Sequence, residues 1–222
     1  ASRGASKSFM LALYSVVRCI LYPGTKVKIA SKTIPQASVI IDEKVMELYR
    51  MSPAVRSAIG SENNIKNNNN KGSSVEFLNG STISVVTASD SARGNRANLL
   101  VIDEFVHVDK DVIDSVLKPM ATVMRQPPYL NKREYKNYPK EENKTVYISS
   151  AWYKSHWSWK QFEQYINDTT NDDGQVLAIS SAYSLPLNNG LLSQNKLEQD
   201  RTDFDNLRFQ MEYESIFVGQ AG

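Results

Sequence analysis

The segment "NLLVIDEF" (residues 98–105) is a continuous apolar run that ends in two acids. Runs of this kind are typical of a central parallel strand that is covered on both faces. An aspartate at the carboxyl end of such a strand lies where open α/β sheets bind their ligands. The segment therefore predicts a buried strand that presents Asp103 and Glu104 at a ligand-binding edge. The alternative is that the two acids simply end a strand at a solvated loop.

Strand patterns alternate with helix patterns on both sides of this segment, which predicts an α/β fold with a mainly parallel sheet and crossover connections. The further strands are expected at 26–31, within 145–152 and at 175–183. Helices are expected at 9–21, at about 35–49, after Ser52 as N-cap, at about 109–124 and at about 194–213. Asn79-Gly80 between two β-rich runs predicts a hairpin, and residues 62–74 are expected to form a mobile loop.

The run "SRGASKS" (residues 2–8) precedes the first helix and ends in Lys-Ser. Loops that bind phosphate through their backbone follow the pattern G-x-x-x-x-G-K-[ST]. Lys7 and Ser8 fit this pattern, but Ser6 stands where the glycine before the lysine is expected. The run is either a phosphate-binding loop with one glycine replaced or a chance Lys-Ser before an ordinary helix.

The residue types at the strand ends fit the chemistry of nucleotide hydrolysis. Asp103 could hold Mg²⁺, directly or through water, and Glu104 could polarise an attacking water as a general base. Ser149 and Ser150 end another apolar strand, where their hydroxyls could hydrogen-bond the water or the γ-phosphate. The alternative for this serine pair is a plain strand-to-loop exit.

Composition excludes several classes of protein. The chain has 222 residues, a net charge of +2 and one cysteine, Cys19, which lies in an apolar run and is expected to be a buried thiol. The apolar run 9–21 is too short to span a bilayer and lacks a secretory cleavage site. We therefore expect a cytosolic protein with no membrane partner, and any binding to a polyanion would need a local basic patch.

Several motifs resemble, in order, the ATPase domain of the large terminase subunit, the DNA-packaging motor of tailed bacteriophages. The run "SRGASKS" resembles the family's divergent Walker A motif, and "SARGNRANLLVIDEF" (91–105) resembles its Arg-Gly segment followed by Walker B. The segments "YISSAW" (147–152) and "FQMEYESIF" (209–217) resemble its coupling motif and its closing signature. The resemblance implies a three-layer P-loop fold of the RecA-like kind, with helices on both faces of the sheet and an added β-hairpin.

The resemblance also implies roles for individual residues. Lys7 would bind the β- and γ-phosphates, Ser8 and Asp103 would bind Mg²⁺, and Ser149 and Ser150 would form the coupling motif. Catalysis would use Glu104 together with two arginines, Arg3 of Walker A and Arg93 of the Arg-Gly segment. Of these, Arg93 would reach a neighbouring subunit's nucleotide. Arg96 is a weaker substitute for Arg93, and for both arginines a solvated or loop-bracing charge is the alternative. The residues expected at the nucleotide are Ser2, Arg3, Gly4, Ala5, Ser6, Lys7 and Ser8.

The function implied by the resemblance is ATP hydrolysis that drives double-stranded DNA into a preformed capsid. The implied cofactors are ATP and Mg²⁺. The implied partners are the DNA, a homo-oligomeric ring of subunits, the portal protein of the prohead and the terminase small subunit, all in the host cytoplasm. Residues 1–222 would form one P-loop ATPase domain, excerpted from a longer protein without the strand before the loop or the nuclease domain. We expect such an excerpt to be slow, largely monomeric and free of nuclease activity.

Two other functions stay open from the sequence: another RecA-like nucleic-acid ATPase such as a helicase, and a nucleotide-binding or structural module whose loop has degenerated at Ser6. Two further segments have alternative interpretations. Trp152, Trp157 and Trp159 could grip nucleic acid or could pack as the entry to a helix. The charged excursion 125–144, with Lys132, Arg133, Lys136 and Lys140, could touch DNA phosphates or could be a solvated loop.

Overall fold

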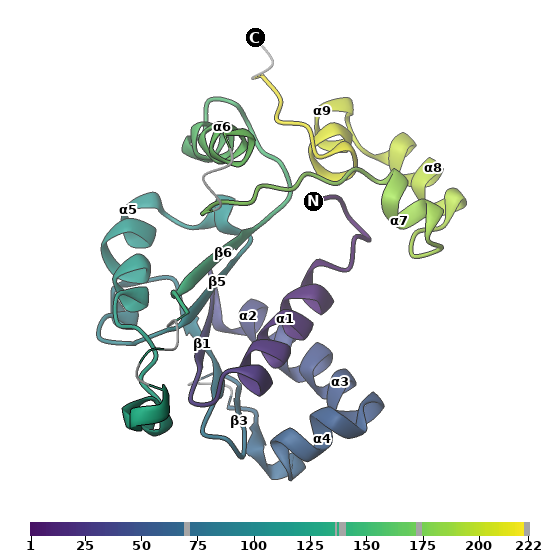
Figure 1. Ribbon diagram of the computed structural model, residues 1–222. Helices are drawn as coiled ribbons and strands as arrows, with labels where there is room; N and C mark the ends of the chain where they lie inside the picture. The colour runs from purple at the N-terminus through teal and green to yellow at the C-terminus, as the bar shows by residue number, and fades with distance from the viewer. Residues whose placement is uncertain (69–71, 136, 138–140, 172–174, 220–222) are drawn as a thin grey trace. The chain divides into compact units, whose positions relative to one another are not determined.

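The computed structural model describes residues 1–68, 72–135, 137, 141–171 and 175–219. The chain divides into two compact units, one formed by Ser8–Ile148 and the other by Ala1–Lys7 together with Ser149–Gly222. Figure 1 shows the labelled helices and strands of both units. Among the helices in the described residues, none is long and apolar enough to cross a membrane.

The unit Ser8–Ile148 is built on a six-stranded sheet with the strand order β2-β3-β4-β1-β5-β6. The strands are β1 (Lys26–Ser31), β2 (Ile65–Lys66), β3 (Ser74–Glu76), β4 (Thr82–Thr87), β5 (Leu99–Asp103) and β6 (Lys144–Ile148). The pairs β4-β1, β1-β5 and β5-β6 are parallel, whereas β2-β3 and β3-β4 are antiparallel. The predicted α/β fold with a mainly parallel sheet is confirmed. The strand 99–103 lies inside the sheet, between β1 and the edge strand β6, and is not at its centre.

Helices cover one face of this sheet and bury its apolar side chains. They are α1 (Lys7–Leu21), α2 (Ile34–Val39), the π-helical segment η1 (Ile40–Val45), α3 (Met46–Met51) and α4 (Pro53–Ile59). Their inward side chains pack against Val27 and Ile29 of β1, Ile83 of β4 and Val101 of β5. Cys19 is fully buried in this core, and its burial raises the pKa of the thiol. Ser52 caps α4 as expected, because its side chain accepts a hydrogen bond from the Val55 amide.

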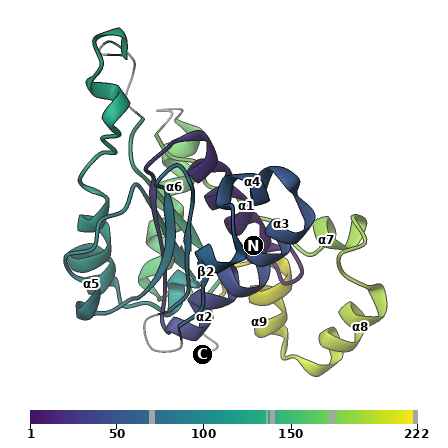
Figure 2. The same cartoon turned by 90° about the horizontal axis from the view of Figure 1, so that it is seen from below.

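The other face of the sheet is covered by shorter helical turns, which Figure 2 shows around α5, on the side of the sheet opposite α1–α4. They are α5 (Lys110–Val112), the π-helical η5 (Ile113–Leu117) and the 3-10 helix η6 (Lys118–Ala121). The helix predicted at about 109–124 is therefore a run of three different helical turns that begins at the N-cap Asp109. Two more 3-10 turns are η3 (Asp90–Ala92) and η4 (Phe105–His107).

The hairpin predicted at Asn79-Gly80 is confirmed, because Val75 of β3 lies opposite Ile83 of β4 and Gly80 has a φ of 81°. The prediction of a structureless loop at 62–74 is wrong for its first part. After the 3-10 turn η2 (Glu62–Asn64), strand β2 pairs with β3, with Ile65 opposite Val75. A single apolar residue, Ile65, is enough for a strand to form here, because β3 supplies the hydrogen-bond partners of its backbone. Residues 69–71 of this segment lie outside the described residues.

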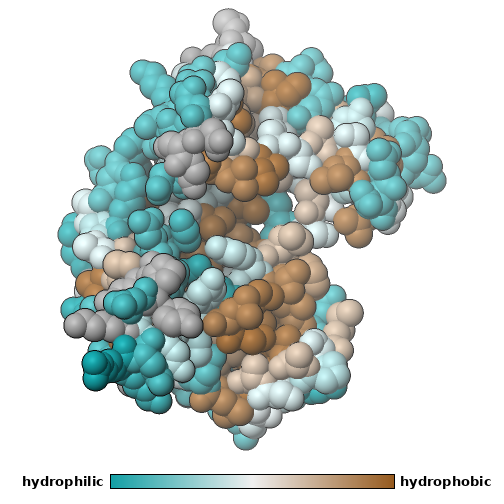
Figure 3. Space-filling model, in the orientation of Figure 1, coloured by the Kyte–Doolittle hydropathy of each residue, from teal (hydrophilic) through white to brown (hydrophobic). Residues whose placement is uncertain are grey.

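The outward face of α1 exposes a row of large apolar side chains. Met10, Tyr14, Val17 and Leu21 follow one another at helical spacing, and Met10 and Leu21 are 57% and 66% exposed. Figure 3 shows the apolar area that these side chains contribute to over α1. This helix therefore has one stripe in the core and a second stripe at the surface, which agrees with a sequence that is apolar almost all round.

The excursion 125–144 contains the 3-10 turns η7 (Pro128–Asn131) and η8 (Arg133–Tyr135) and is attached to the sheet unit through Arg125. The Arg125 guanidinium is buried, forms a two-pronged pair with Glu141 and donates to the Pro23 carbonyl at 2.8 Å. By contrast, Lys132 and Arg133 are exposed. Lys136 and Lys140 lie outside the described residues. One end of the excursion is thus anchored by a buried ion pair.

The unit of Ala1–Lys7 and Ser149–Gly222 is helical. Its elements are α6 (Trp157–Thr170), α7 (Ser184–Asn188), α8 (Gln194–Asp203), α9 (Asn206–Phe209) and the π-helical η9 (Gln210–Glu214). The helical pattern predicted at about 194–213 is confirmed as α8, α9 and η9. Tyr213 of η9 is buried against α8 and donates a hydrogen bond to Asp200. Burial, followed by this bond, raises the pKa of Tyr213 to about 12.

The strand predicted at 175–183 is wrong. Residues 175–183 form no strand, and Leu177 and Ile179 are 76% and 73% exposed. The backbone of this segment instead contacts α6, where the Thr169 hydroxyl donates to the Val176 carbonyl at 3.3 Å and accepts from the Ala178 amide at 2.9 Å. An apolar alternating pattern makes a strand only where another strand offers an edge.

Candidate functional site

The amino-terminal run 1–7 forms a tight loop that is held at two of its backbone amides. The Ser2 amide donates to the Ser181 carbonyl at 2.9 Å, and the Arg3 amide donates to the Glu212 carbonyl at 2.8 Å. The next amides, those of Gly4, Ala5 and Ser6, make no hydrogen bond within the described part of the chain. Gly4 and Ser6 are both in the left-handed region, with φ of 73° and 51°. Alternation of this kind turns successive amides to one side, which is how a backbone anion nest is built.

Lys7 closes this loop. Its Nζ donates to the Ala1 carbonyl at 3.2 Å, and it donates to the Ser150 hydroxyl, also at 3.2 Å. Lys7 and Ser8 are the first two residues of α1, so the loop leads directly into a helix amino terminus. Amides without a protein acceptor and a nearby lysine ammonium in one loop are a donor set that fits a phosphate.

Arg3 and Ser150 share one acceptor, Glu212, which the sequence analysis did not place at the site. The Glu212 Oε2 atom accepts from Arg3 Nε at 3.1 Å and from the Ser150 hydroxyl at 3.2 Å. Because Ser150 also accepts from Lys7, a continuous network joins Lys7, Ser150, Glu212 and Arg3. The signal that could have identified Glu212 is its place in "FQMEYESIF", which we used only as a family signature. Ser149 is buried in the same unit.

Ser6 holds a backbone conformation that ordinarily suits glycine, and its side chain makes no hydrogen bond within the described residues. A left-handed non-glycine residue costs roughly 1–2 kcal/mol. We therefore expect Ser6→Gly to raise the free energy of unfolding by about 1 kcal/mol, measured by denaturant titration. Ser6→Ala is the matched control, because it removes the hydroxyl but keeps the Cβ that causes the strain. An equal gain in both variants would contradict this explanation.

The acid pair lies in the other unit, at the carboxyl end of the internal strand β5. Asp103 is the last residue of β5 and lies opposite Ile148 of β6. Glu104 follows with φ 47° and ψ 49°, which is again left-handed, and both acids are half-buried. The turn after them is packed by Phe105, whose ring lies edge-on to Tyr147 with centroids 5.6 Å apart. Backbone strain of this kind clusters at functional sites, since the surrounding structure must hold the residue in place.

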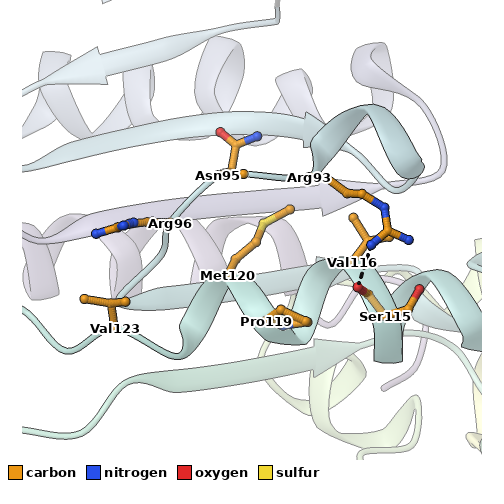
Figure 4. A pocket seen from close by; sticks show the side chains of 9 residues that line it. Arg93, Asn95, Arg96, Ser115, Val116, Pro119, Met120 and Val123 are labelled. Atoms are coloured by element: carbon orange, nitrogen blue, oxygen red, sulfur yellow. Dashed lines mark hydrogen bonds between the residues drawn. The ribbon is translucent and has the colours of Figure 1, made fainter.

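Arg93 lies in the same unit as the acids, in the loop after η3. Its guanidinium pairs with Asp90 at 2.9 Å and donates to the Ser115 carbonyl at 3.3 Å, and the side chain is 59% exposed. Figure 4 shows Arg93 at one end of a pocket of about 310 Å³, with Arg96 extending the opposite way. The other lining residues are Gly94, Asn95, Ser115, Val116, Pro119, Met120 and Val123. In this conformation the Arg93 guanidinium contacts Asp90 and the Ser115 carbonyl, and its action on a neighbouring subunit's nucleotide stays a prediction.

The tryptophan-rich segment packs within its own unit. Trp159 and Phe162 contact Phe217, with ring centroids 5.1 and 5.3 Å apart, and Trp152 belongs to the same apolar cluster. Lys154 lies over the Trp159 ring at 5.2 Å. Of the two interpretations offered for these tryptophans, packing describes Trp152 and Trp159.

The residues present fit the groups that a nucleotide site would hold. The loop offers amide and ammonium donors for a phosphate. The hydroxyl of Ser8 and the carboxylate of Asp103 are oxygen ligands, the type that Mg²⁺ prefers. The structure places these groups in two units, and their convergence on one triphosphate stays a prediction.

Comparison with known proteins agrees with a P-loop-like α/β class. Solved structures of two phage terminases match the fold. For the ATPase domain of the Thermus phage P74-26 large terminase, the TM-score is 0.64 at 16% identity, over 98% of this chain and 86% of that chain. For the large terminase of a second thermophilic bacteriophage, the TM-score is 0.68 at 13% identity, over 98% of this chain and 47% of that chain. This chain therefore spans about half the length of the second protein. A further structure of that protein, in complex with ADP, matches with a TM-score of 0.63.

The family match is independent of these structures. Residues 1–204 match the family model described as "Terminase large subunit, T4likevirus-type, N-terminal". The chain belongs to this family, as the motifs in its sequence implied. No curated protein matches the sequence.

Proposed function

We propose that this chain is an ATP-hydrolysing motor domain that drives double-stranded DNA into a preformed viral capsid. The observation that carries the proposal is the family match over residues 1–204, which includes every residue suggested for the nucleotide site. The loop geometry at Gly4–Lys7 adds support, because its unbonded amides and ammonium group form an anion-binding arrangement. An ADP complex of a structurally similar terminase also supports nucleotide binding.

Binding of the triphosphate is assigned to the loop. The amides of Gly4, Ala5 and Ser6 would donate to phosphate oxygens, and Lys7 would exchange its present acceptors for the β- and γ-phosphates. Ser8 and Asp103 would hold Mg²⁺. When bound, this ion would neutralise charge on the phosphate oxygens.

The chemical step is assigned to Glu104. Its carboxylate would orient a water molecule and accept its proton as the water oxygen attacks the γ-phosphorus in line. The bond from that phosphorus to the bridging oxygen breaks, and ADP leaves. Arg3 and Arg93 would neutralise the charge that develops on the γ-phosphate, Arg93 from a neighbouring subunit. Arg93 must then leave Asp90 and Ser115, its partners in this conformation.

Glu212 is a positioning residue in this scheme. Because one carboxylate oxygen accepts from both Arg3 and Ser150, it fixes the arginine relative to the serine pair. Ser149 and Ser150 would report the state of the nucleotide through this network. The partners proposed for the whole motor are double-stranded DNA, a homo-oligomeric ring, the portal protein and the terminase small subunit, in the host cytoplasm.

The proposal is tested with the full-length subunit in an ATPase assay. We expect turnover to rise when proheads with docked portal and double-stranded DNA are added, and to be unchanged by forked duplexes that a helicase would unwind. Stimulation by the forks together with strand separation would favour the helicase alternative. Binding of ATP with no turnover under any of these conditions would favour a degenerate module.

A further inference from the structure

The sheet face that α5, η5 and η6 cover carries polar side chains on the strands β1, β3 and β4. Strand residues alternate between the two faces, so Val27 and Ile29 in the helix-covered core place Lys26 and Lys28 on this opposite face. Lys28 lies opposite Ser84 of β4, and Ser84 lies opposite Ser74 of β3. Lys26 lies opposite Thr82. We call Lys26, Lys28, Ser74, Thr82 and Ser84 the lysine–hydroxyl strip.

The strip is exposed at Lys26 and partly accessible along the rest of its length. Lys26 is exposed, and the other members are half-buried, whereas Leu100 and Ile102 of β5 on the same face are fully buried. The Lys28 Nζ donates to the Ser84 hydroxyl at 2.8 Å, which confirms that both side chains are on one face. Burial, followed by the charge of Lys26, lowers the pKa of Lys28. Two like charges are thus held close together on a partly desolvated surface.

The cations here lack carboxylates. Within the described residues, no salt bridge involves Lys26 or Lys28. The carboxylate of Glu76 lies on the same face, opposite Thr82, and is paired with Lys66 of β2 at 2.6 Å. Glu76 and Lys66 together add no net charge, so the strip keeps the positive charge of Lys26 and Lys28.

Arg96 adds a third cation near the start of β1. The backbone amide of Asn98 donates to the Lys26 carbonyl at 2.7 Å, and the side-chain Oδ1 of Asn98 accepts from the Lys26 amide at 3.0 Å. These two bonds place the loop before β5 beside Lys26. Arg96 is two residues before Asn98 and exposed, and Figure 4 shows its side chain extending toward the amino ends of the strands. Within the described part of the chain, Arg96 also has no acidic partner.

We infer that the lysine–hydroxyl strip, with Arg96 at its end, binds the phosphate backbone of a nucleic-acid duplex. Lysine, arginine and serine or threonine hydroxyls are the side chains that contact phosphates. The strip has no aromatic residue on which an unpaired base could stack, which favours a duplex over a single strand. Protein interfaces are depleted in lysine and serine, which disfavours a protein partner. The choice of duplex DNA as the ligand rests on the proposed function, but the binding site is separate from the nucleotide loop.

The test is binding of a fluorescent duplex DNA to the protein without nucleotide, over a series of salt concentrations. Each phosphate contact contributes about 0.9 to the slope of log affinity against log salt. We expect the variant with Lys26→Gln and Lys28→Met to lower that slope by about 2. Methionine keeps the stem of Lys28, and thermal melting checks that the variant is folded. The variant with Lys26→Arg and Lys28→Arg should retain the slope.

The matched control is Lys44→Gln with Arg50→Gln, which removes the same charge from the helical run on the other face of the sheet. It should leave the slope within experimental error of the parent. An unchanged slope in the folded Lys26 and Lys28 variant would overturn the inference. The inference would also be overturned if this variant lost self-association but kept its binding of duplex DNA, or if it lost affinity for single-stranded DNA alone. Because no ATP is present, failure of the proposed hydrolysis would not produce any of these results.

Discussion

Glu104→Ala is expected to lower the turnover number for ATP hydrolysis by about 100-fold or more, which is the contribution typical of a positioned general base. The affinity for ATP should be nearly unchanged, because the phosphates are assigned to the loop 4–7 and not to this carboxylate. Glu104→Gln should have a similar effect, since it keeps the size of the side chain and removes its basicity. Turnover is measured by phosphate release from the full-length subunit, and affinity by titration with a non-hydrolysable ATP analogue.

The conformation of Glu104 provides a second, independent readout. A left-handed residue with a Cβ is strained by roughly 1–2 kcal/mol relative to glycine, and Glu104 has a φ of 47°. Glu104→Gly should therefore unfold with a free energy about 1 kcal/mol higher than Glu104→Ala, although both should show the same lowered turnover. The comparison is direct because both variants lack the carboxylate.

Glu47→Ala, on the surface of α3, is the control for the turnover measurement and should retain turnover. Equal turnover in Glu104→Ala and the parent would rule out the mechanism.

Arg125→Ala is expected to lower the free energy of unfolding by about 3–5 kcal/mol, the usual cost of removing one partner from a buried ion pair. The guanidinium side chain is 4% exposed and is paired with Glu141. It also donates to the Pro23 carbonyl at 2.8 Å and to the Tyr129 hydroxyl at 3.0 Å. The substitution leaves the Glu141 carboxylate and these acceptors without their donor. Denaturant titration monitored by circular dichroism measures the change.

Two further variants show whether the pair itself is responsible. Arg133→Ala, an exposed position in the same excursion, should change the free energy of unfolding by no more than about 0.5 kcal/mol. Replacing both partners, with Arg125→Met and Glu141→Leu, should cost less than Arg125→Ala alone because no buried charge is left unpaired. A loss of under about 1 kcal/mol in Arg125→Ala would mean that the segment 125–144 is not anchored in this way.

The sequence predicted the members of the candidate site better than their contacts. Lys7 and Ser150 were both proposed as site residues, because "KS" opens a helix and "SS" follows a strand. The structure brings their side chains together. Glu212 was missed because it is far along the chain and its chemistry appears only once Arg3 and Ser150 share its oxygen. The lysine–hydroxyl strip was also missed. No local motif marks it, since its members come from three strands and meet only through the sheet register.

Local sequence patterns were enough to predict the helix at 9–21, which the structure extends to Lys7–Leu21, the strands 26–31 and 99–103 and the hairpin at Asn79-Gly80. Periodicity, capping and turn residues act over a few neighbours, so they can be read from the sequence. Whether Ile65–Lys66 and 175–183 form strands could not be predicted from local patterns, because strand formation depends on a partner edge supplied from elsewhere in the chain. Ile65–Lys66 has such a partner in β3, and 175–183 has none among the described residues. The same reason applies to function. The acids and the lysine are visible in the sequence, but the left-handed backbone at Ser6 and Glu104 and the burial of Arg125 result from packing that the whole fold imposes.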